Sequence, residues 1–324
     1  MHMADALISA PVAGIAGAAA AALIVIAGIR VKRCADKRIV PLMGVMGAFI
    51  FAAQMINFSI PGTGSSGHII GGVLLAALLG PWAAFLTLVS VLLVQCLVFA
   101  DGGLMALGCN IVNMAAMSCL LAYPLVMKPL LRFPASPFRI LCVSVLACVV
   151  GLEAGACLVV GETVASGITA LPAGKFFMFM TPIHLVIGIC EGLATGAVLC
   201  FVQRTRPDLL HPDMQAGKKS LKPVLISFAA AALLFGGGLA YLASGNPDGL
   251  EWSVEKVAGA PEIGSAGDSG IAAGLAAAQS KTALMPDYDH SLAGILGAAM
   301  TMTLLWALTS IIVRSRRKAS VKSR

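Results

Sequence analysis

Long apolar stretches recur along the whole chain, separated by short polar breaks. A helix needs about 20 apolar residues to cross the roughly 30 Å hydrocarbon core of a bilayer, and most of these stretches approach that length. Hydrophobic residues make up 59% of the 324 residues and charged residues only 11%, whereas a soluble domain has about 25% charged residues. The pattern therefore predicts an all-α integral membrane protein.

The apolar stretches predict nine crossings and two domains. We expect the crossings at about residues 8–29, 40–58, 69–79, 81–99, 104–127, 138–160, 176–201, 222–243 and 291–312. The third is short, so we expect it to be tilted or half-inserted within the bundle. A polar linker at 206–221 divides a seven-helix body, 1–205, from a two-helix hairpin, 222–324. The connection inside the hairpin, about 244–290, is acidic, and its middle has the small, flexible composition of a linker.

Basic residues concentrate on one side of the predicted membrane. Of the 22 lysines and arginines, 19 fall on the same side if the nine crossings alternate. They are Arg30, Lys32, Arg33, Lys37, Arg38, Lys128, Arg132, Arg139, Arg204, Arg206, Lys218, Lys219, Lys222, Arg314, Arg316, Arg317, Lys318, Lys322 and Arg324. The positive-inside rule makes this side cytoplasmic, with the N-terminus outside and the C-terminus inside. The net charge of +7 thus reflects topology in a multi-pass protein of the inner (plasma) membrane, with the bilayer rather than nucleic acid as its partner.

Two histidines are expected to meet at the outer face: His2 at the start of the chain and His68 between the second and third crossings. If Met1 is the terminal residue, its α-amino nitrogen, the His2 backbone nitrogen and the His2 ring Nδ1 can wrap one metal ion in two fused rings. His68 could supply a fourth nitrogen. Four nitrogens in a plane suit Ni(II) or Cu(II), whereas Zn(II) favours a tetrahedron and Mg(II) favours oxygen ligands. The alternative is that position 2 is arbitrary and His68 only caps a helix.

Further polar residues are candidates for supporting roles. The loop that precedes His68 is rich in glycine, and its Ser65 and Ser66 could supply hydrogen bonds around a metal site. Asn110 and Asn113 lie three residues apart on the fifth crossing, share one helix face and could brace that loop.

Intramembrane Glu153, Glu191 and His184 are costly in lipid and should face the bundle interior, either as satisfied core groups or as part of a translocation path. We expect no resident cofactor, and no enzymatic activity, because the chain lacks G-x-S-x-G and H-E-x-x-H motifs. It also lacks a P-loop, so any ATP hydrolysis must come from other subunits. The nine cysteines include no Cys-x-x-Cys pair and suit small apolar core positions. The start lacks the basic residues of a cleaved signal peptide, so we expect Met1 to be retained.

Four stretches together resemble one known family: MHMADALIS at the start, PGTGSSGHIIGG at 61–72, ALGCNIVNMA at 106–115 and NPDGLEW at 246–252. The first three resemble the substrate-specificity component of energy-coupling factor transporters for nickel and cobalt, of the NikM or CbiM type. The fourth resembles the accessory subunit of the NikN or CbiN type, here fused to the body. Cys109 departs from the small residue expected at its position.

The resemblance implies a subunit that captures a transition metal and works with a transmembrane coupling subunit and a cytoplasmic ATPase pair. Carried over by position, Met1, His2 and His68 look like the metal ligands, and Asn110 and Asn113 match a pair of asparagines in the family. The start and the fusion favour Ni(II), with Co(II) the alternative. The resemblance also suggests that the external PDGLEW segment docks over the metal loop. A stand-alone proton-coupled carrier that uses Glu153, Glu191 or His184 would instead need no ATPase.

Overall fold

The computed structural model describes residues 1–34, 39–210, 220–259, 270–288 and 292–322. The body begins with a 3-10 turn, η1 (Asp5–Leu7). Its remaining elements are α1 (Ala10–Cys34), α2 (Ile39–Gln54), β1 (Phe58–Ile60), β2 (Ser65–Gly67), α3 (Gly72–Leu79), α4 (Pro81–Phe99), α5 (Leu107–Asn110), the π-helical η2 (Ile111–Met127), α6 (Lys128–Leu130), α7 (Pro137–Ser166), α8 (Ala173–Thr205) and η3 (Pro207–Leu209). Together α5, η2 and α6 form one apolar helix from 107 to 130.

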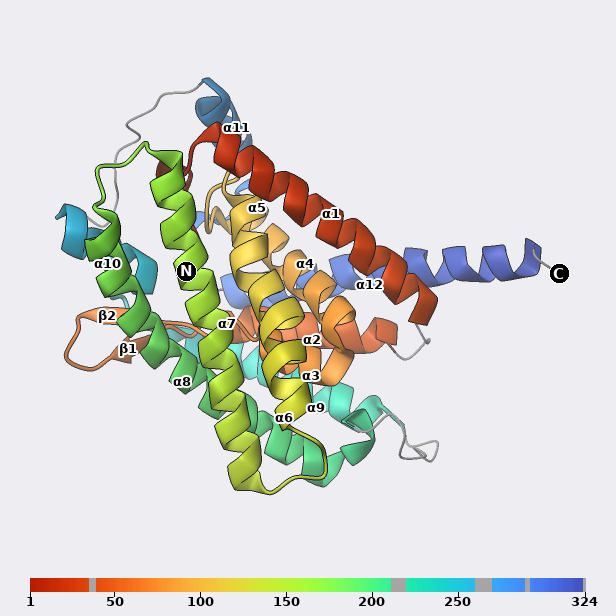
Figure 1. Cartoon of the computed structure of the whole chain (residues 1–324). Helices are drawn as coiled ribbons and strands as arrows, with labels where there is room; N and C mark the ends of the chain where they lie inside the picture. The colour runs from red at the N-terminus through yellow and green to blue at the C-terminus, as the bar shows by residue number, and fades with distance from the viewer. Residues whose placement is uncertain (35–38, 211–219, 260–269, 289–291, 323–324) are drawn as a thin grey trace.

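The C-terminal part has two apolar helices joined by a partly helical connection. Its elements are α9 (Lys222–Gly237), η4 (Leu239–Leu242), α10 (Gly249–Ala258), α11 (Gly270–Thr282), η5 (Pro286–Tyr288) and α12 (Ala293–Lys322). Figure 1 shows α12 extending away from the bundle towards the C-terminus.

The predicted crossings coincide with helices, but the helices differ in length. Six are long and apolar enough to cross a membrane: α1, α4, 107–130, α7, α8 and 293–312. The helices α2 and α9 are apolar but have only 16 residues each. The third predicted crossing is reduced to the eight residues of α3, about 12 Å of helix, which lies almost wholly inside the bundle. The all-α membrane architecture is therefore confirmed, while nine crossings and their orientation stay predictions.

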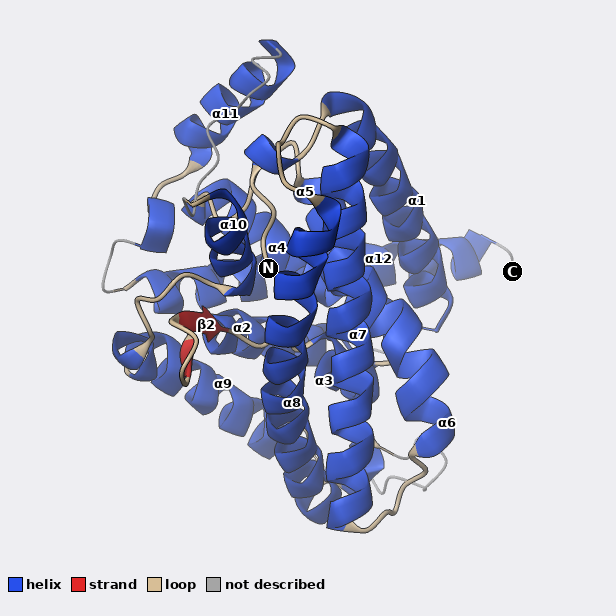
Figure 2. Cartoon of the chain, turned by 60° about the vertical axis from the view of Figure 1, so that its left-hand side comes forward, coloured by secondary structure: helices blue, strands red, loops and turns tan. Residues whose placement is uncertain are grey.

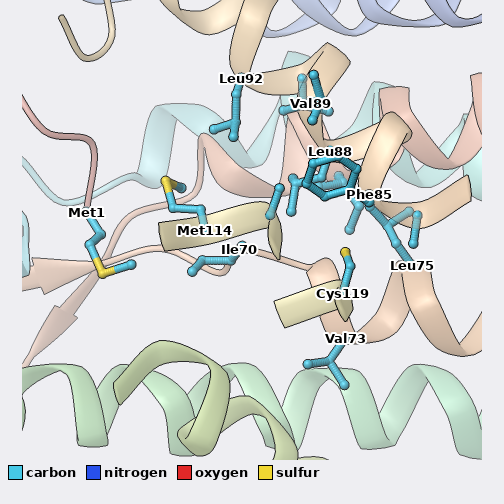
Figure 3. Packing of buried hydrophobic residues seen from close by; sticks show 14 of the residues in the cluster. Met1, Ile70, Val73, Leu75, Phe85, Leu88, Val89, Leu92, Met114 and Cys119 are labelled. Atoms are coloured by element: carbon cyan, nitrogen blue, oxygen red, sulfur yellow. The ribbon is translucent and has the colours of Figure 1, made fainter. Parts of the chain in front are cut away.

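Helix α4 lies at the centre of the bundle. In its apolar 18-residue stretch, 83% of the residues are buried. It packs against α3, η2, α2 and α1, while α7 pairs along its length with α8. On another side, α12 packs on α2 and α9. Figure 3 shows side chains from several of these helices meeting in one cluster, which includes Phe85, Leu88, Met114 and Ile70. The hairpin, through residues such as Leu250 and Leu305, is thus part of the same hydrophobic core as the body.

The described parts of the connection at 244–290 contain more helix than its composition indicates. Helix α10 begins with a complete capping box, in which Asp248 accepts from the backbone of Leu250 and Glu251, and Glu251 accepts from the backbone of Asp248. Leu250 and Val254 are buried against the body. The middle was expected to be a linker, yet its residues 270–282 form α11; residues 260–269 lie outside the described part. Small residues with high helix propensity, notably alanine, explain the helix, and α11 remains mostly exposed.

Candidate functional site

The first residues of the chain run into the interior of the bundle. Met1 is only 4% exposed and Met3 is fully buried. Asn110 holds this segment at both backbone groups of Met3: its Oδ1 accepts from Met3 N at 2.7 Å, and its Nδ2 donates to Met3 O at 3.3 Å. Figures 1 and 2 show the N-terminus deep among the helices and close to α10. The segment therefore has a fixed path before α1 begins.

The loop after α4 provides a second support for this segment. Gly103 N donates to Met3 O at 2.9 Å, and the Asp5 carboxylate accepts from Ala106 N at 2.9 Å. Gly102 has a φ of 80°, and a Cβ there would meet His2 Cβ at 3.2 Å. Glycine is needed at this position because both the backbone conformation and the close approach exclude a side chain. Burial raises the pKa of Asp5, an effect that the backbone hydrogen bonds oppose.

His68 lies just after a short antiparallel hairpin, β1–β2, in which Ser59 pairs with Ser66. The buried Glu191 of α8 accepts from Ile70 N at 2.8 Å and Gly71 N at 2.9 Å, and so fixes the backbone after His68. Gly71 then turns the chain into α3 with a φ of 77°. These contacts account for the burial of Glu191 as a satisfied core group, one of the two roles expected for it.

The three predicted ligand residues meet at one point. The Met1 amine nitrogen lies 3.4 Å from His68 Nε2, and the rings of His2 and His68 are nearly parallel with centroids 5.5 Å apart. His68 Nδ1 lies 3.2 Å from the Ile69 carbonyl oxygen, so Nδ1 carries the proton and Nε2 presents a lone pair to the amine. Two nitrogens that are each about 2.0 Å from one ion lie roughly 2.8–4.0 Å apart, a range that includes this separation.

The His2 ring is held from two sides. Its Nε2 lies 3.2 Å from Gln95 Oε1 on α4, and its Nδ1 lies 3.2 Å from the carboxylate of Asp101. Both histidines line a cavity of about 620 Å³, together with Gln54, Gln95 and the acidic side chains of Asp101, Asp248 and Glu251. Carboxylates around the cavity attract cations, and the imidazole rings form part of its wall.

The PDGLEW segment lies over the loop that carries His68. Ser66 N donates to Pro247 O at 2.8 Å, Ser66 Oγ donates to Asn246 O at 2.8 Å, and Trp252 Nε1 donates to Thr63 O at 3.0 Å. Ser65 Oγ also faces Pro247 O, at 3.4 Å. The expectation that the serines could support a metal site stays a prediction; in this structure their hydroxyl groups join the loop to the hairpin.

Asp248 is a site residue that sequence reasoning did not single out. Its Oδ2 lies 2.5 Å from the Met1 ammonium nitrogen, and its side chain is 17% exposed. The same carboxylate caps α10, so one side chain links the accessory helix to the start of the chain. The signal was present in the sequence: an aspartate that begins a capping box in a segment expected on the same face as His2 and His68.

Burial and the ammonium group set the charge state of the site. The pKa of His68 is lowered to about 3, by burial first and then by the Met1 ammonium group and His2. Burial also lowers the pKa of His2, although Asp101 acts in the opposite direction. Burial raises the pKa of Asp248, but the ammonium group and His68 outweigh burial, so this pKa lies below its ordinary value. The His68 ring is therefore neutral, as a metal ligand must be.

The remaining candidates lie around this point. Asn110 and Asn113 were expected to brace the His68 loop, but both contact Met3; Asn113 Nδ2 also donates to Glu162 at 2.7 Å. The correction follows from the fold, which places that face of the helix against the N-terminal segment. Glu153 has a buried oxygen without a hydrogen-bond partner among the described residues.

His184 donates from Nδ1 to Met180 O at 2.8 Å, while its Nε2 has no hydrogen-bond partner within the described part of the chain. Its ring lines a small space of about 10 Å³ shared with Met1 and His68. The two other histidines, His211 and His290, lie outside the described residues. Across the described ranges, no group of three or more histidine, cysteine, aspartate or glutamate side chains has a metal-holding arrangement.

Residues 2–209 match the CbiM family, described as the cobalt uptake substrate-specific transmembrane region. The chain belongs to this family. Residues 222–314 also match the PDGLE domain. The CbiM match covers the body with the N-terminal segment, and the PDGLE match covers the helices and the connection that lie over it.

The relatives of this chain include fused proteins that align with most of its length. A protein from Archaeoglobus fulgidus, provisionally named as a fused nickel transport protein, is 32% identical over 95% of this chain and 98% of its own. The fused nickel transport protein of Rhodobacter capsulatus is 28% identical over 85% of this chain and 82% of its own. A crystal structure of a truncated transition metal transporter superposes with a TM-score of 0.55 at 32% identity, over 63% of this chain and 99% of that one.

Proposed function

We propose that this chain is the substrate-binding membrane subunit of an ATP-driven energy-coupling factor transporter that imports Ni(II), with Co(II) as the alternative cargo. The observation that carries the proposal is the convergence of the Met1 amine, His2 and His68 beside an acidic cavity. A cation can be attracted by the carboxylates and then exchange its water for nitrogen ligands. The names of the related proteins, which are nickel and cobalt transport proteins, support the same class of cargo.

The proposed ligands are the Met1 amine nitrogen, the His2 backbone nitrogen, His2 Nδ1 and His68 Nε2. The amine must lose the proton that it now donates towards Asp248, and the amide must lose its own. A planar set of four nitrogens favours Ni(II) or Cu(II) over Zn(II). The two fused relatives named for nickel favour Ni(II) as the cargo.

A direct test measures Ni(II) on the purified full chain. We expect one tightly bound ion per chain and an X-ray absorption spectrum of a planar nitrogen site with two imidazoles. Intact mass of the same sample establishes whether Met1 is the terminal residue. Absence of bound Ni(II) and Co(II) from protein with a free Met1 amine would refute the proposed cargo.

The proposed partners are a transmembrane coupling subunit and a pair of cytoplasmic ATPases. Because the sequence has no P-loop, uptake against a gradient should need those subunits. Proteoliposomes that contain this chain alone should bind Ni(II) without accumulating it, whatever the proton gradient. Accumulation driven by a proton gradient would favour the stand-alone carrier with Glu153 or His184 as its relay.

The proposed orientation has the site outside and the basic ends of the helices in the cytoplasm. It is supported by Gln203 of α8, whose side-chain amide pairs with both backbone groups of Ala135 and so joins two basic segments at one end of the bundle. Reporter fusions at residues 35, 133, 212 and 320 should indicate cytoplasm, and one at 265 the exterior. The same fusions test the division into a body at 1–205, a linker at 206–221 and an accessory hairpin at 222–324.

A further inference from the structure

A chain of buried amides leads from the His68 loop to the His2 ring. Gln54 Nε2 donates to the Ile70 carbonyl oxygen at 2.8 Å, and Gln95 Nε2 donates to Gln54 Oε1 at 2.7 Å. Gln95 Oε1 then lies 3.2 Å from His2 Nε2. Gln54 and Gln95 are only 4% and 1% exposed. We call these two side chains the glutamine relay.

The Ile70 carbonyl determines the direction of every bond in the glutamine relay. A carbonyl oxygen only accepts, so Gln54 must present its NH₂ group to Ile70 and its oxygen to Gln95. Gln95 must then present its NH₂ group to Gln54 and its oxygen to His2. A side-chain amide cannot reverse within this chain without placing two donors or two acceptors against each other. The group that faces Gln95 from the His2 ring must therefore be an N–H.

A proton on Nε2 leaves Nδ1 of the neutral His2 ring with its lone pair free. Nδ1 is the ring nitrogen that closes a chelate with the backbone nitrogen of the same residue, whereas Nε2 lies on the far side of the ring. Hydrogen bonds from the second ring nitrogen commonly fix the tautomer and orientation of metal-binding histidines. We propose that Gln95, held in place by Gln54, is a positioning residue that keeps His2 in the Nε2–H tautomer required for metal capture.

Asp101 shows why such a positioning residue is needed. Its carboxylate lies 3.2 Å from His2 Nδ1 and, as an acceptor, favours a proton on that nitrogen. The glutamine relay and Asp101 therefore favour opposite tautomers in the metal-free protein. Loss of the Gln95 acceptor leaves Asp101 to draw the proton to Nδ1, where it blocks the chelate. When a cation occupies Nδ1, the same carboxylate becomes a favourable neighbour.

The tautomer can be measured without any metal. The full chain, labelled with ¹⁵N-histidine and kept metal-free at mildly alkaline pH, gives distinct nitrogen shifts for the two forms, and the His2 signals are those missing from His2→Ala. Wild type should show the Nε2–H form and Gln95→Leu the Nδ1–H form. Gln95→Glu, which as a buried neutral acid can still accept from His2 and donate to Gln54 Oε1, should restore the wild-type form. Ser90→Ala, which removes a buried hydroxyl bonded within the same helix, should change nothing.

Ni(II) titration of the same samples gives the second readout. Gln95→Leu should bind about 10–100-fold more weakly than wild type, and Gln95→Glu should recover most of that loss. Gln54→Leu leaves Gln95 free to turn and should give a mixture of tautomers, which provides a second variant if Gln95→Leu fails to fold. A wild-type ring in the Nδ1–H form, or unchanged tautomer and affinity in the glutamine variants, would overturn the assignment.

Only the effect on affinity rests on the proposed function. If the tautomers change as expected but wild type binds no Ni(II), the positioning role stands and the proposed cargo fails. If wild type binds Ni(II) tightly while His2 adopts the wrong tautomer, the cargo stands and the positioning role fails.

Discussion

Two segments that lie more than 230 positions apart in the sequence meet at the candidate site, and the structure holds them differently. Residues 1–8 are held by Asn110 and Gly103, which bond the backbone of Met3, and by the Asp5 carboxylate, which accepts from Ala106 N. Met1 and Met3 are buried. Residues 244–258 lie on the loop at 58–67 through hydrogen bonds from the Ser66 N–H and hydroxyl groups, and Asp248 forms an ion pair with the Met1 ammonium group. The first segment is part of the core, and the second covers it.

The difference separates the segment that carries proposed metal ligands from the segment that lies over it. Every proposed ligand comes from the body, whereas the hairpin contributes a carboxylate that neutralises the ammonium group of the metal-free protein. We therefore expect changes in the N-terminal segment to abolish Ni(II) binding. Changes in the hairpin should instead affect how residues 244–258 dock on the loop at 58–67. Four predictions test this comparison, in order of decreasing effect.

The largest effect should come from one glycine added before Met1. The change keeps every side chain but replaces the terminal amine by an amide, so Ni(II) affinity should fall by about 1,000-fold or more. His68→Ala should have an effect of similar size. The same glycine added after Arg324 is the matched control. Unchanged affinity in the N-terminally extended protein would show that the terminal amine is not a ligand.

Acidification should weaken Ni(II) binding next most strongly. The ammonium group and the His2 amide release at least two protons on binding, so affinity should fall by about a hundredfold per pH unit below neutrality. His68 should add little to this slope, because its pKa of about 3 keeps the ring neutral. Calorimetry in buffers of different ionisation enthalpy measures the protons released. If Ni(II) affinity does not change with pH, the main-chain nitrogens are not ligands.

Asn110→Ala should cause an intermediate loss. The change leaves the buried Met3 N without its acceptor, at a cost of about 1–3 kcal/mol, whereas Met3 O keeps its hydrogen bond from Gly103 N. The terminus should therefore be less well ordered. Ni(II) affinity should fall by about tenfold if this cost appears in binding. Hydrogen exchange of residues 3–8 should rise in parallel. Asn110→Asp, which keeps the acceptor for Met3 N, should lose less.

Asp248→Asn should change equilibrium affinity least, by less than about threefold. Binding replaces the ammonium charge by a divalent ion next to a deprotonated amide, so the net charge that faces Asp248 stays the same. The loop at 58–67 should exchange its amide hydrogens faster, because the ion pair and part of the α10 cap are weakened. Loss of Ni(II) binding in this variant would show that Asp248 of the hairpin is itself a metal ligand. The two segments would then not differ in the way proposed here.

The sequence predicted much of the candidate site because chemistry and topology pointed to the same residues. A histidine at position 2 has a chelating geometry that other positions lack, and alternation of the crossings placed His68 on the same face. It did not predict Gln54 and Gln95, since buried glutamines in apolar helices carry no pattern that indicates a partner. Asp248 was visible as a cap, but its contact with Met1 joins positions 247 apart, and no local signal reports such a contact.

The sequence by itself determined the class of protein, the place of its helices and the family. Those features depend on apolar length, charge placement and short motifs, all of which are local properties of the chain. Tertiary structure decided the shortness and burial of α3, the ordered cover formed by α10 and the bonds of Asn110, Glu191 and the glutamine relay. The physical reason is that a buried polar group must find a partner wherever packing places one, and packing brings together residues that are distant in sequence.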